Sequence, residues 1–471
     1  TEGEANTAVG RYAGYSTTTG GWNVFIGQNA GYGNTTGIYN NFIGAGAGQS
    51  STTANQSTYI GWYAGFYQQV GGNNVAIGHQ TLYGTSGKAN SATQNVVIGY
   101  QAGYRAEAGY GITAVGDRAF RNISASGSLS TAIGYGAGFY ASGSYNTFVG
   151  AEAGKGGTTS APYSSGQTNT AVGYGALASF TTANDSVAIG FNALGDTSTG
   201  TGNIAIGRDA GADITTGAYG IYIGHNAGGD NLLGNMNVFV GFEAGRSAAD
   251  SVAYSVAIGA YAGKNTAVNT NIAIGYQAAQ THTTGARNIA IGYGAMNDTD
   301  AGSTSLGSDD NIFIGYDAGG GTWANAASEY NVGIGNYVMD GALDGATNNT
   351  ALGHNALSSI TTEDANVAIG YQAMYQGGGT GNIAMGDNAM SQGPTGGANY
   401  AIGRYSMMDC NAGSTSLSSH SNIAIGQSAL GGTWADAASN YNIAIGHTAM
   451  DAALNGALYN IAMGHNSLTA L

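Results

Sequence analysis

The sequence predicts an all-β protein, a repetitive parallel β-solenoid or β-roll of about 26 coils, with a period of about 17 residues. Of 471 residues, 84 are Gly and only 8% are charged, against about 7% Gly and about 25% charged residues in an average protein. Hydrophobic residues nevertheless reach 42%, with 31 Tyr, 11 Phe and 4 Trp, which is not the composition of a disordered chain. A five-residue phrase, Asn-x-(Ala/Phe)-(Ile/Val)-Gly, recurs along the whole chain, and such internal repetition is typical of solenoids.

Composition also excludes several classes of protein. Cys410 is the only cysteine, so one chain cannot form an internal disulfide. No apolar run approaches the ~20 residues of a membrane-spanning helix. Lys and Arg number 11 against 26 Asp and Glu, which argues against a nucleic-acid partner. We therefore expect neither a nucleic-acid partner nor insertion into a membrane. None of the motifs described below indicates a cofactor, and we expect none.

The last Gly of the phrase serves as an anchor for counting. It occurs 26 times, from Gly10 to Gly464, most often 17 residues apart. Neighbouring strands at ~4.8 Å would stack these coils into a rod of about 120–130 Å. We predict a single elongated repeat domain over residues 1–471. Within it, residues 292–403 and 403–464 share a super-repeat offset by 111 residues, since Ala301–Leu306 returns as Ala412–Leu417.

The columns of the repeat predict which side chains face the core. The residue before the anchor and the residue two positions earlier are mostly Ile, Val or Thr, which suit one buried face of a strand. The column between them is Ala in 17 copies and Phe or Tyr in 7, so the outward face also looks covered. A second copy of the chain is the simplest cover. The predicted oligomer contacts are Phe25, Phe42, Tyr59, Phe148, Tyr222, Phe239 and Phe313.

The remaining columns predict turns and ladders. Asn opens the phrase in 20 of 26 copies, and a stacked Asn row can form a hydrogen-bonded ladder or bracket a turn. The anchor Gly suits a turn with positive φ. A second short strand is expected over the Thr-Thr-Gly stretch of each coil, as in Asn34–Gly37.

The phrase, as in Asn203-Ile-Ala-Ile-Gly207, resembles two related repeat families. One is the head repeat of trimeric autotransporter adhesins, and the other is the repeat of bacteriophage tail fibres and spikes. The 17-residue period and the Asn-Thr-Thr-Gly spacer are more similar to the phage version. The resemblance implies a trimeric fibre with host-binding elements. The chain starts and stops in phase with the repeat and lacks an initiator Met, so we expect a processed or partial chain whose anchor and trimerisation segments lie elsewhere.

Candidate chemical motifs are few. His79, His225, His354, His447 and His465 each follow an anchor Gly, but Tyr and Phe share this column, which favours stacking over a metal site. The stretches 298–302 and 409–413 resemble the start of a calcium loop but lack its downstream acidic ligand, and turns explain them better. Glu152, Glu243, Glu329 and Glu363 are isolated, so no catalytic or metal-binding residues are assigned and the chain is not expected to be an enzyme.

Long coils are the best functional lead, because insertions in a solenoid protrude as loops. They lie near 84–93, 155–168, 294–310, 320–330, 404–421 and 431–441. Trp323 and Trp434 occupy equivalent inserted segments and, with Tyr163, are the candidates for stacking on a receptor sugar. For the two Trp the alternative, which we favour, is that each pins its own loop onto the solenoid.

These features predict a structural and recognition protein, the rigid trimeric shaft of a phage tail fibre on the virion. Its expected partners are itself, a carbohydrate receptor on the host surface, and other tail or baseplate proteins bound through segments outside this chain. The alternatives are a bacterial trimeric adhesin at the cell surface and a self-assembling extracellular filament. A polysaccharide-degrading spike and an ice-binding rod rank lower.

Overall fold

A computed structural model describes residues 3–88, 90–123, 128–230, 233–247, 252–265, 270–281, 285–297, 307–323, 326–393, 395–409, 418–434 and 437–469. Each copy of the repeat contributes one three-residue strand, and the 26 strands are parallel. The predicted parallel β-solenoid is therefore confirmed. The chain divides into two compact units, Thr1–Met236 and Asn237–Leu471, which are built from the same coil.

The strands occupy the middle of each repeat phrase. In the first unit they are β1 (Thr7–Val9), β2 (Val24–Ile26), β3 (Asn41–Ile43), β4 (Thr58–Ile60), β5 (Val75–Ile77), β6 (Val96–Ile98), β7 (Thr113–Val115), β8 (Thr131–Ile133), β9 (Thr147–Val149), β10 (Thr170–Val172), β11 (Val187–Ile189), β12 (Ile204–Ile206) and β13 (Ile221–Ile223). In the second unit they are β14 (Val238–Val240), β15 (Val256–Ile258), β16 (Ile272–Ile274), β17 (Ile289–Ile291), β18 (Ile312–Ile314), β19 (Val332–Ile334), β20 (Thr350–Leu352), β21 (Val367–Ile369), β22 (Ile383–Met385), β23 (Tyr400–Ile402), β24 (Ile423–Ile425), β25 (Ile443–Ile445) and β26 (Ile461–Met463).

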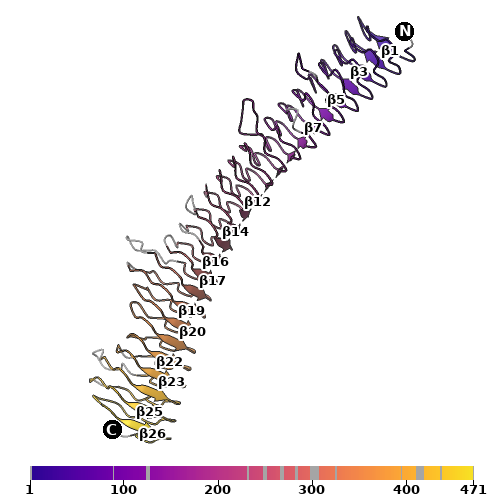
Figure 1. Ribbon diagram of the computed structural model, residues 1–471. Coiled ribbons are helices and arrows are strands. Elements are labelled where there is room, and N and C mark those ends of the chain that lie inside the picture. Colours follow the sequence, from indigo (N-terminus) through magenta and orange to yellow (C-terminus); the bar gives the residue numbers. More distant parts are fainter. Residues whose placement is uncertain are drawn as a thin grey trace. The chain divides into compact units, whose positions relative to one another are not determined.

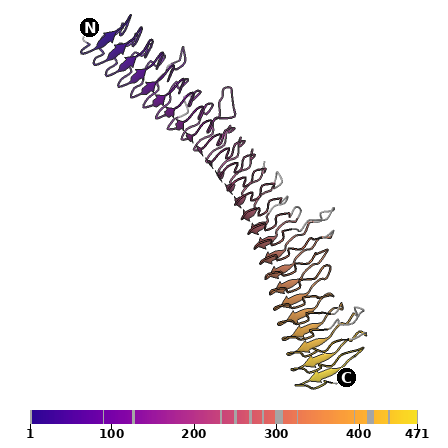
Figure 2. The same cartoon turned by 180° about the vertical axis from the view of Figure 1, so that it is seen from behind.

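Within each unit, every strand pairs in parallel with the strand of the next coil. The register matches equivalent repeat positions, as where Ala8 lies opposite Phe25. Each unit thus has a ladder of strands along one side of its stack, and the longer connections leave from the other side (Figures 1 and 2). The same register holds where the spacing is longer than 17 residues, as where Ala290 lies opposite Phe313. The strand phrase and not the length of the coil therefore sets the register.

The Thr-Thr-Gly stretch does not form the expected second strand. Thr35 and Thr36 adopt a bend, although the N–H of Thr35 still donates to the carbonyl of Thr52 in the next coil at 2.9 Å. Backbone hydrogen bonds therefore join successive coils outside the strands as well, without the extended geometry of a ladder.

The anchor Gly closes each strand in a conformation that L-residues rarely adopt. At Gly27, φ is +130°, and an added Cβ would lie 2.7 Å from the carbonyl carbon and oxygen of Gly44 in the next coil. The predicted positive φ is confirmed, and the close approach between coils adds a second reason for glycine.

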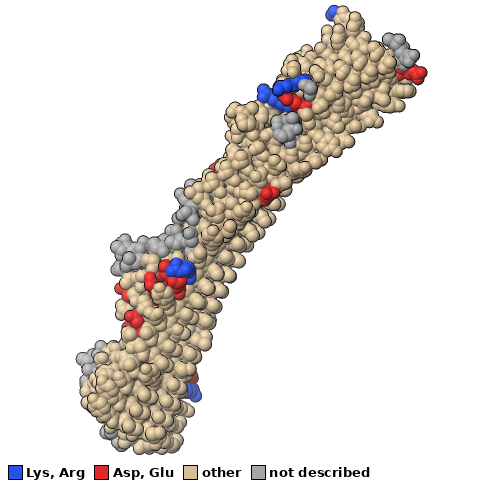
Figure 3. All heavy atoms as spheres, viewed as in Figure 1, with Lys and Arg blue, Asp and Glu red and all other residues tan. Residues whose placement is uncertain are grey.

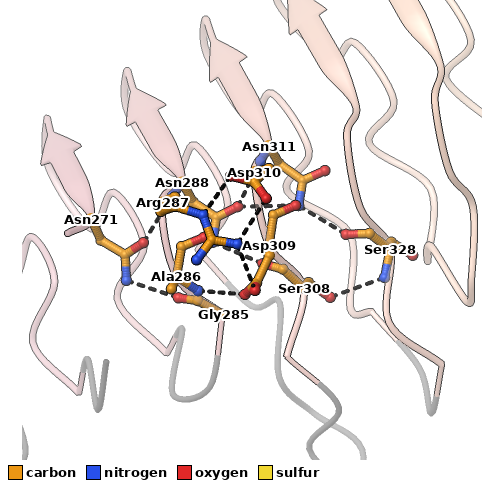
Figure 4. Close-up of polar contacts among 10 residues, drawn as sticks. All are labelled: Asn271, Gly285, Ala286, Arg287, Asn288, Ser308, Asp309, Asp310, Asn311 and Ser328. Atoms are coloured by element: carbon orange, nitrogen blue, oxygen red, sulfur yellow. Dashed lines mark hydrogen bonds and ion pairs between the residues drawn. The ribbon is translucent and has the colours of Figure 1, made fainter. Parts of the chain in front are cut away.

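The Asn column forms the predicted ladder (Figure 4). The backbone N–H of Asn288 donates to Asn271 Oδ1, and that of Asn311 donates to Asn288 Oδ1, both at 2.9 Å. Asn288 Nδ2 donates to the Ser308 carbonyl and Asn311 Nδ2 to the Ser328 carbonyl, both at 2.8 Å. Each Asn side chain thus accepts from a backbone N–H of the following coil and donates to a backbone carbonyl in the loop that leads to that coil. Buried backbone N–H and C=O groups need such hydrogen-bond partners.

In most coils a large side chain occupies one of two core positions, the strand centre or the turn. Phe42 at the centre of β3 fills its coil, and the turn residue opposite it is Gly48, whose added Cβ would lie 2.6 Å from the Phe42 ring. In the next coil but one, Ala76 occupies the strand centre and Leu82 occupies the turn, and both are fully buried. All seven coils with Phe or Tyr at the strand centre have Gly at this turn position, so the two columns share one small interior.

Candidate functional site

The central residue of each strand points into the solenoid and not outward. Exposure is 0–2% at the seven predicted oligomer contacts, which are Phe25, Phe42, Tyr59, Phe148, Tyr222, Phe239 and Phe313. Their assignment to a surface between chains is therefore wrong. The thin coil encloses little volume, so an aromatic ring at the inward position always faces a turn Gly, and Leu or Met at the turn always faces Ala or Gly at the strand centre.

The outward face of the strands carries the two flanking columns that were expected in the core. In every strand the first and third residues are half-buried or exposed, as in β12, where Ile204 and Ile206 flank buried Ala205. The third column holds only Ile, Val, Leu and Met, and the first column has Asn41 as its only amide and no charge. We call these two columns the strand face. It is apolar from coil to coil in both units.

Trp323 and Trp434 are not available to stack on a sugar. Trp323 is 1% exposed, donates from Nε1 to the Gly319 carbonyl at 3.1 Å, and packs edge-on against Phe313. Trp434 is 2% exposed, and its backbone N–H donates to the Asp409 carbonyl at 3.2 Å. Both buried indoles pin their inserted segments onto the solenoid, which is the alternative that the sequence favoured.

Tyr163 lies at the rim of a pocket. The inserted segment 155–168, between β9 and β10, protrudes from the stack (Figure 1) and forms a cavity of about 380 Å³ with the preceding coils. Its polar lining comes from Arg105, Glu107, Asn122, Ser142, Tyr163 and Ser165. Arg105 Nη1 donates to the Tyr163 hydroxyl at 2.7 Å across 58 residues of sequence. The segment therefore reaches back over earlier coils.

The segment 155–168 is held at both ends by the coils beneath it. The backbone N–H groups of Gly157 and Ser165 donate to carbonyls of the following coil at 2.7 and 2.8 Å. The N–H of Ser164 donates to the Tyr140 carbonyl at 3.0 Å, and Ser142 Oγ donates to the Ser164 carbonyl at 3.1 Å. These bonds fix the position of Tyr163 relative to the pocket floor.

Aromatic and His side chains after the anchor Gly stack from coil to coil. His79 stacks on Tyr100 with 5.3 Å between ring centroids, and His447 stacks on His465 at 5.0 Å. Tyr276, Tyr293 and Tyr316 continue the same pattern in the second unit. The column therefore acts as a stacking column, as predicted. Within the described ranges, no group of three or more His, Cys, Asp or Glu side chains is arranged to hold a metal ion.

Three of the four glutamates singled out in the sequence have partners for their carboxylates, and Glu243 is described in the next paragraph. Glu152 lies 3.2 Å from Lys155 Nζ, and the Glu363 carboxylate accepts from the Thr361 and Thr362 N–H groups. Of the calcium-like stretches, Asp409 is described and accepts from Thr433 Oγ1 at 2.9 Å. Residues 298–302 and 410–413 lie outside the described residues.

Neighbouring charges and burial shift the pKa values of several acidic side chains, among them Glu243 and Asp213. Hydrogen bonding to Lys264, with added attraction from Lys264 and Arg246, holds the pKa of Glu243 below its ordinary value, despite burial. Partial burial raises the pKa of Asp213, and the negative charges of Asp230 and Asp196 raise it further. A carboxylate in a neighbouring coil therefore opposes the ionisation of an acidic side chain, and a Lys or Arg in a neighbouring coil favours it.

Sequence reasoning did not assign the residues that meet Tyr163 in the pocket. Arg105 and Asn122 hold the same position in successive coils, and neither belongs to the recurring phrase. Basic residues could have indicated the place, because five of the 11 Lys and Arg residues lie between residues 88 and 155. Which of their side chains meet the inserted segment depends on how that segment folds back.

No part of the chain that the structure describes forms a helix long and apolar enough to cross a membrane. No family model, curated protein or solved structure matches the chain.

Proposed function

We propose that this chain is the shaft of a homotrimeric fibre, of the kind carried on a bacteriophage tail, which holds receptor-binding surfaces away from the particle. The observation that carries the proposal is the strand face. Apolar surface gains about 25 cal/mol for each Å² removed from water, and continuous apolar patches above a few hundred Å² mark interaction sites.

Another copy of the same chain is the partner that best fits this face. Its own strand face repeats with the same 17-residue period, so contacts made by one coil can recur in the next. Identical chains associate through closed symmetry, and the number of three follows the resemblance to trimeric fibre repeats. A net charge of −15 favours solubility of the finished fibre.

The native mass of the assembly tests the proposal. We expect about three times the chain mass of 46.9 kDa, unchanged on dilution, by sedimentation equilibrium or light scattering. In the double variant Ile206→Lys/Ile223→Lys, two exposed Ile of adjacent strands place charges in the interface, and the mass should fall to that of one chain. The matched control is Thr199→Lys/Thr216→Lys, which adds the same charge at exposed turn positions and should remain trimeric.

Other outcomes separate the alternatives. A wild-type monomer, or a trimer that survives both Ile substitutions, would contradict the assignment of the strand face. An open-ended distribution of masses would select the extracellular filament. A membrane-anchor domain in the full-length gene would select the bacterial adhesin, which would use the same strand face.

A further inference from the structure

The pocket beneath segment 155–168 contains a guanidinium group with no carboxylate partner. Most of the described Lys and Arg side chains form ion pairs, as do Arg208 with Asp209 at 3.2 Å and Arg404 with Asp387 at 3.1 Å. Across the described ranges, no ion pair is found for Arg105, although it lies in the pocket wall. Its only side-chain hydrogen bond there goes to the Tyr163 hydroxyl. A guanidinium has five N–H donors, so most of them face the pocket or solvent.

The surroundings of this pocket are basic in an acidic chain. Residues 88–155 contain five Lys or Arg and three Asp or Glu, a net charge of +2, while the whole chain has −15. Arg121 follows one coil after Arg105 and has an aromatic ring on either side, with its guanidinium 5.2 Å from the Tyr104 centroid and 5.5 Å from the Phe139 centroid. In Figure 3, Lys and Arg side chains lie beside the protruding segment, with acidic atoms among them. The local field therefore attracts an anion.

The rest of the lining suits a sugar. Asn122 and Ser165 offer amide and hydroxyl groups, and Glu107 offers a carboxylate that can accept from sugar hydroxyls. Ile123, Ala161 and Pro162 add apolar surface. The Tyr163 ring stacks towards Tyr140 with 6.1 Å between centroids, and tyrosine rings pack well against amphipathic ligands. Tyr140 itself lines a separate, smaller cavity of about 170 Å³ with Lys155.

We infer that the pocket between segment 155–168 and the coils of Arg105 and Asn122 binds an acidic saccharide, with its carboxylate on the Arg105 guanidinium. The planar guanidinium matches a carboxylate through two parallel hydrogen bonds. The Tyr163 hydroxyl accepts a hydrogen bond from the Arg105 guanidinium and so orients it. The Tyr163 ring packs against the sugar. This inference rests on the proposed function as a host-attachment fibre and names the receptor chemistry of one of its binding surfaces.

Calorimetric or NMR titration of the whole protein tests the site. The probes are sodium glucuronate and 3′-sialyllactose, with glucose and lactose as neutral counterparts. We expect saturable binding of the acidic probes and at least 10-fold weaker binding of the neutral ones. Arg105→Ala should weaken binding of the acidic probes at least 10-fold. Arg208→Ala is the matched control, because it removes an exposed arginine from the same unit, and it should bind like the wild type.

A second substitution separates binding from folding. Tyr163→Phe keeps the ring and removes only the hydroxyl that Arg105 contacts, so we expect a change of less than about 10-fold, while Tyr163→Ala should abolish binding. Equal affinity for acidic and neutral sugars, or unchanged binding by Arg105→Ala, would overturn the inference. If no sugar binds while the protein still attaches to host cells, the pocket assignment fails and the attachment function survives. If the acidic sugar binds but attachment to cells is absent, the proposed function fails and the site survives.

Discussion

At the scale of single residues, glycine is required by contacts between coils as well as by its backbone angles. Gly27 and its equivalents approach the backbone of the next anchor so closely that a methyl group has no space. Gly87, in the long coil near 84–93, also has a positive φ, of +74°, but nothing lies within 4 Å of an added Cβ. Both positions strain an L-residue, but only Gly27 also lacks space for a Cβ.

Gly27→Ala should therefore destabilise the first unit much more than Gly87→Ala. The strained φ alone costs about 1–3 kcal/mol, and the overlap with the Gly44 carbonyl adds to it only at position 27. Urea unfolding, or amide hydrogen exchange in β2 and β3, measures the difference. Equal losses in the two variants would show that contact between coils does not matter at the anchor.

The shared core volume gives a second prediction at this scale. Phe42→Ala should cost about 3–5 kcal/mol in free energy of unfolding, because it leaves a cavity. Gly48→Leu alone should also destabilise, since its Cβ would meet the Phe42 ring at 2.6 Å.

The double variant Phe42→Ala/Gly48→Leu should be more stable than either single variant. It recreates the Ala-and-Leu arrangement found at Ala76 and Leu82, and Leu82 already has a φ of +50°, close to the +57° of Gly48. A double-mutant cycle by chemical unfolding measures the coupling. Additive losses would contradict a common core site.

At the scale of the element, a coil is a unit that can satisfy its polar groups only with a neighbour. The Asn ladder shows this, because each amide side chain accepts from one coil and donates to a loop carbonyl. Where Ser replaces Asn, as at Ser130, the hydroxyl still accepts from Asn146 N–H at 3.1 Å. The shorter side chain therefore retains the coil-to-coil bond, which explains why Ser is the common alternative.

Stacking of coils also brings charged side chains of neighbouring coils close together. The stability of the fold should therefore depend on pH. Glu243 has a lowered pKa, so its ion pairs stabilise the fold above its ordinary pKa of 4.5, and this stabilisation is lost as the pH falls through the lower, folded-state value. Asp213 has a raised pKa, so its ionisation opposes folding as the pH rises from 3.8 through the folded-state value. The two carboxylates therefore act with opposite sign at neutral pH.

Glu243→Gln should lower the stability of the second unit at pH 7, and Asp213→Asn should raise the stability of the first. Both differences should fade in acid, where the wild-type carboxyl groups become neutral. Thermal unfolding of each variant at pH 7 and at about pH 3 measures the differences. Loss of stability in Asp213→Asn at pH 7 would contradict the account of repulsion from Asp230 and Asp196.

At the scale of the whole molecule, repetition of the coil extends the apolar strand face over many coils of each unit. One pair of half-exposed Ile residues would be ordinary on a protein surface, but equivalent residues recur in 26 strands. The same repetition makes an interruption conspicuous, and segment 155–168 interrupts the stack where the chain is locally basic. In the proposals above, assembly would use the strand face and recognition would use an inserted loop, which lie on different sides of a coil.

The sequence by itself determined the architecture of this protein. The 17-residue period, the anchor Gly, the Asn column and the alternation within each strand are properties of one repeat, so stacking follows from local chemistry. Alternation shows which side chains share a face, but it does not say which face is inside. Only the tertiary structure decided that Phe42 and Ala76 point inward and Ile206 outward, because that choice depends on the volume enclosed by the whole coil and on the turn residue opposite. Likewise, the meeting of Arg105 with Tyr163, 58 residues apart, depends on the path of an inserted loop, which no periodic pattern encodes.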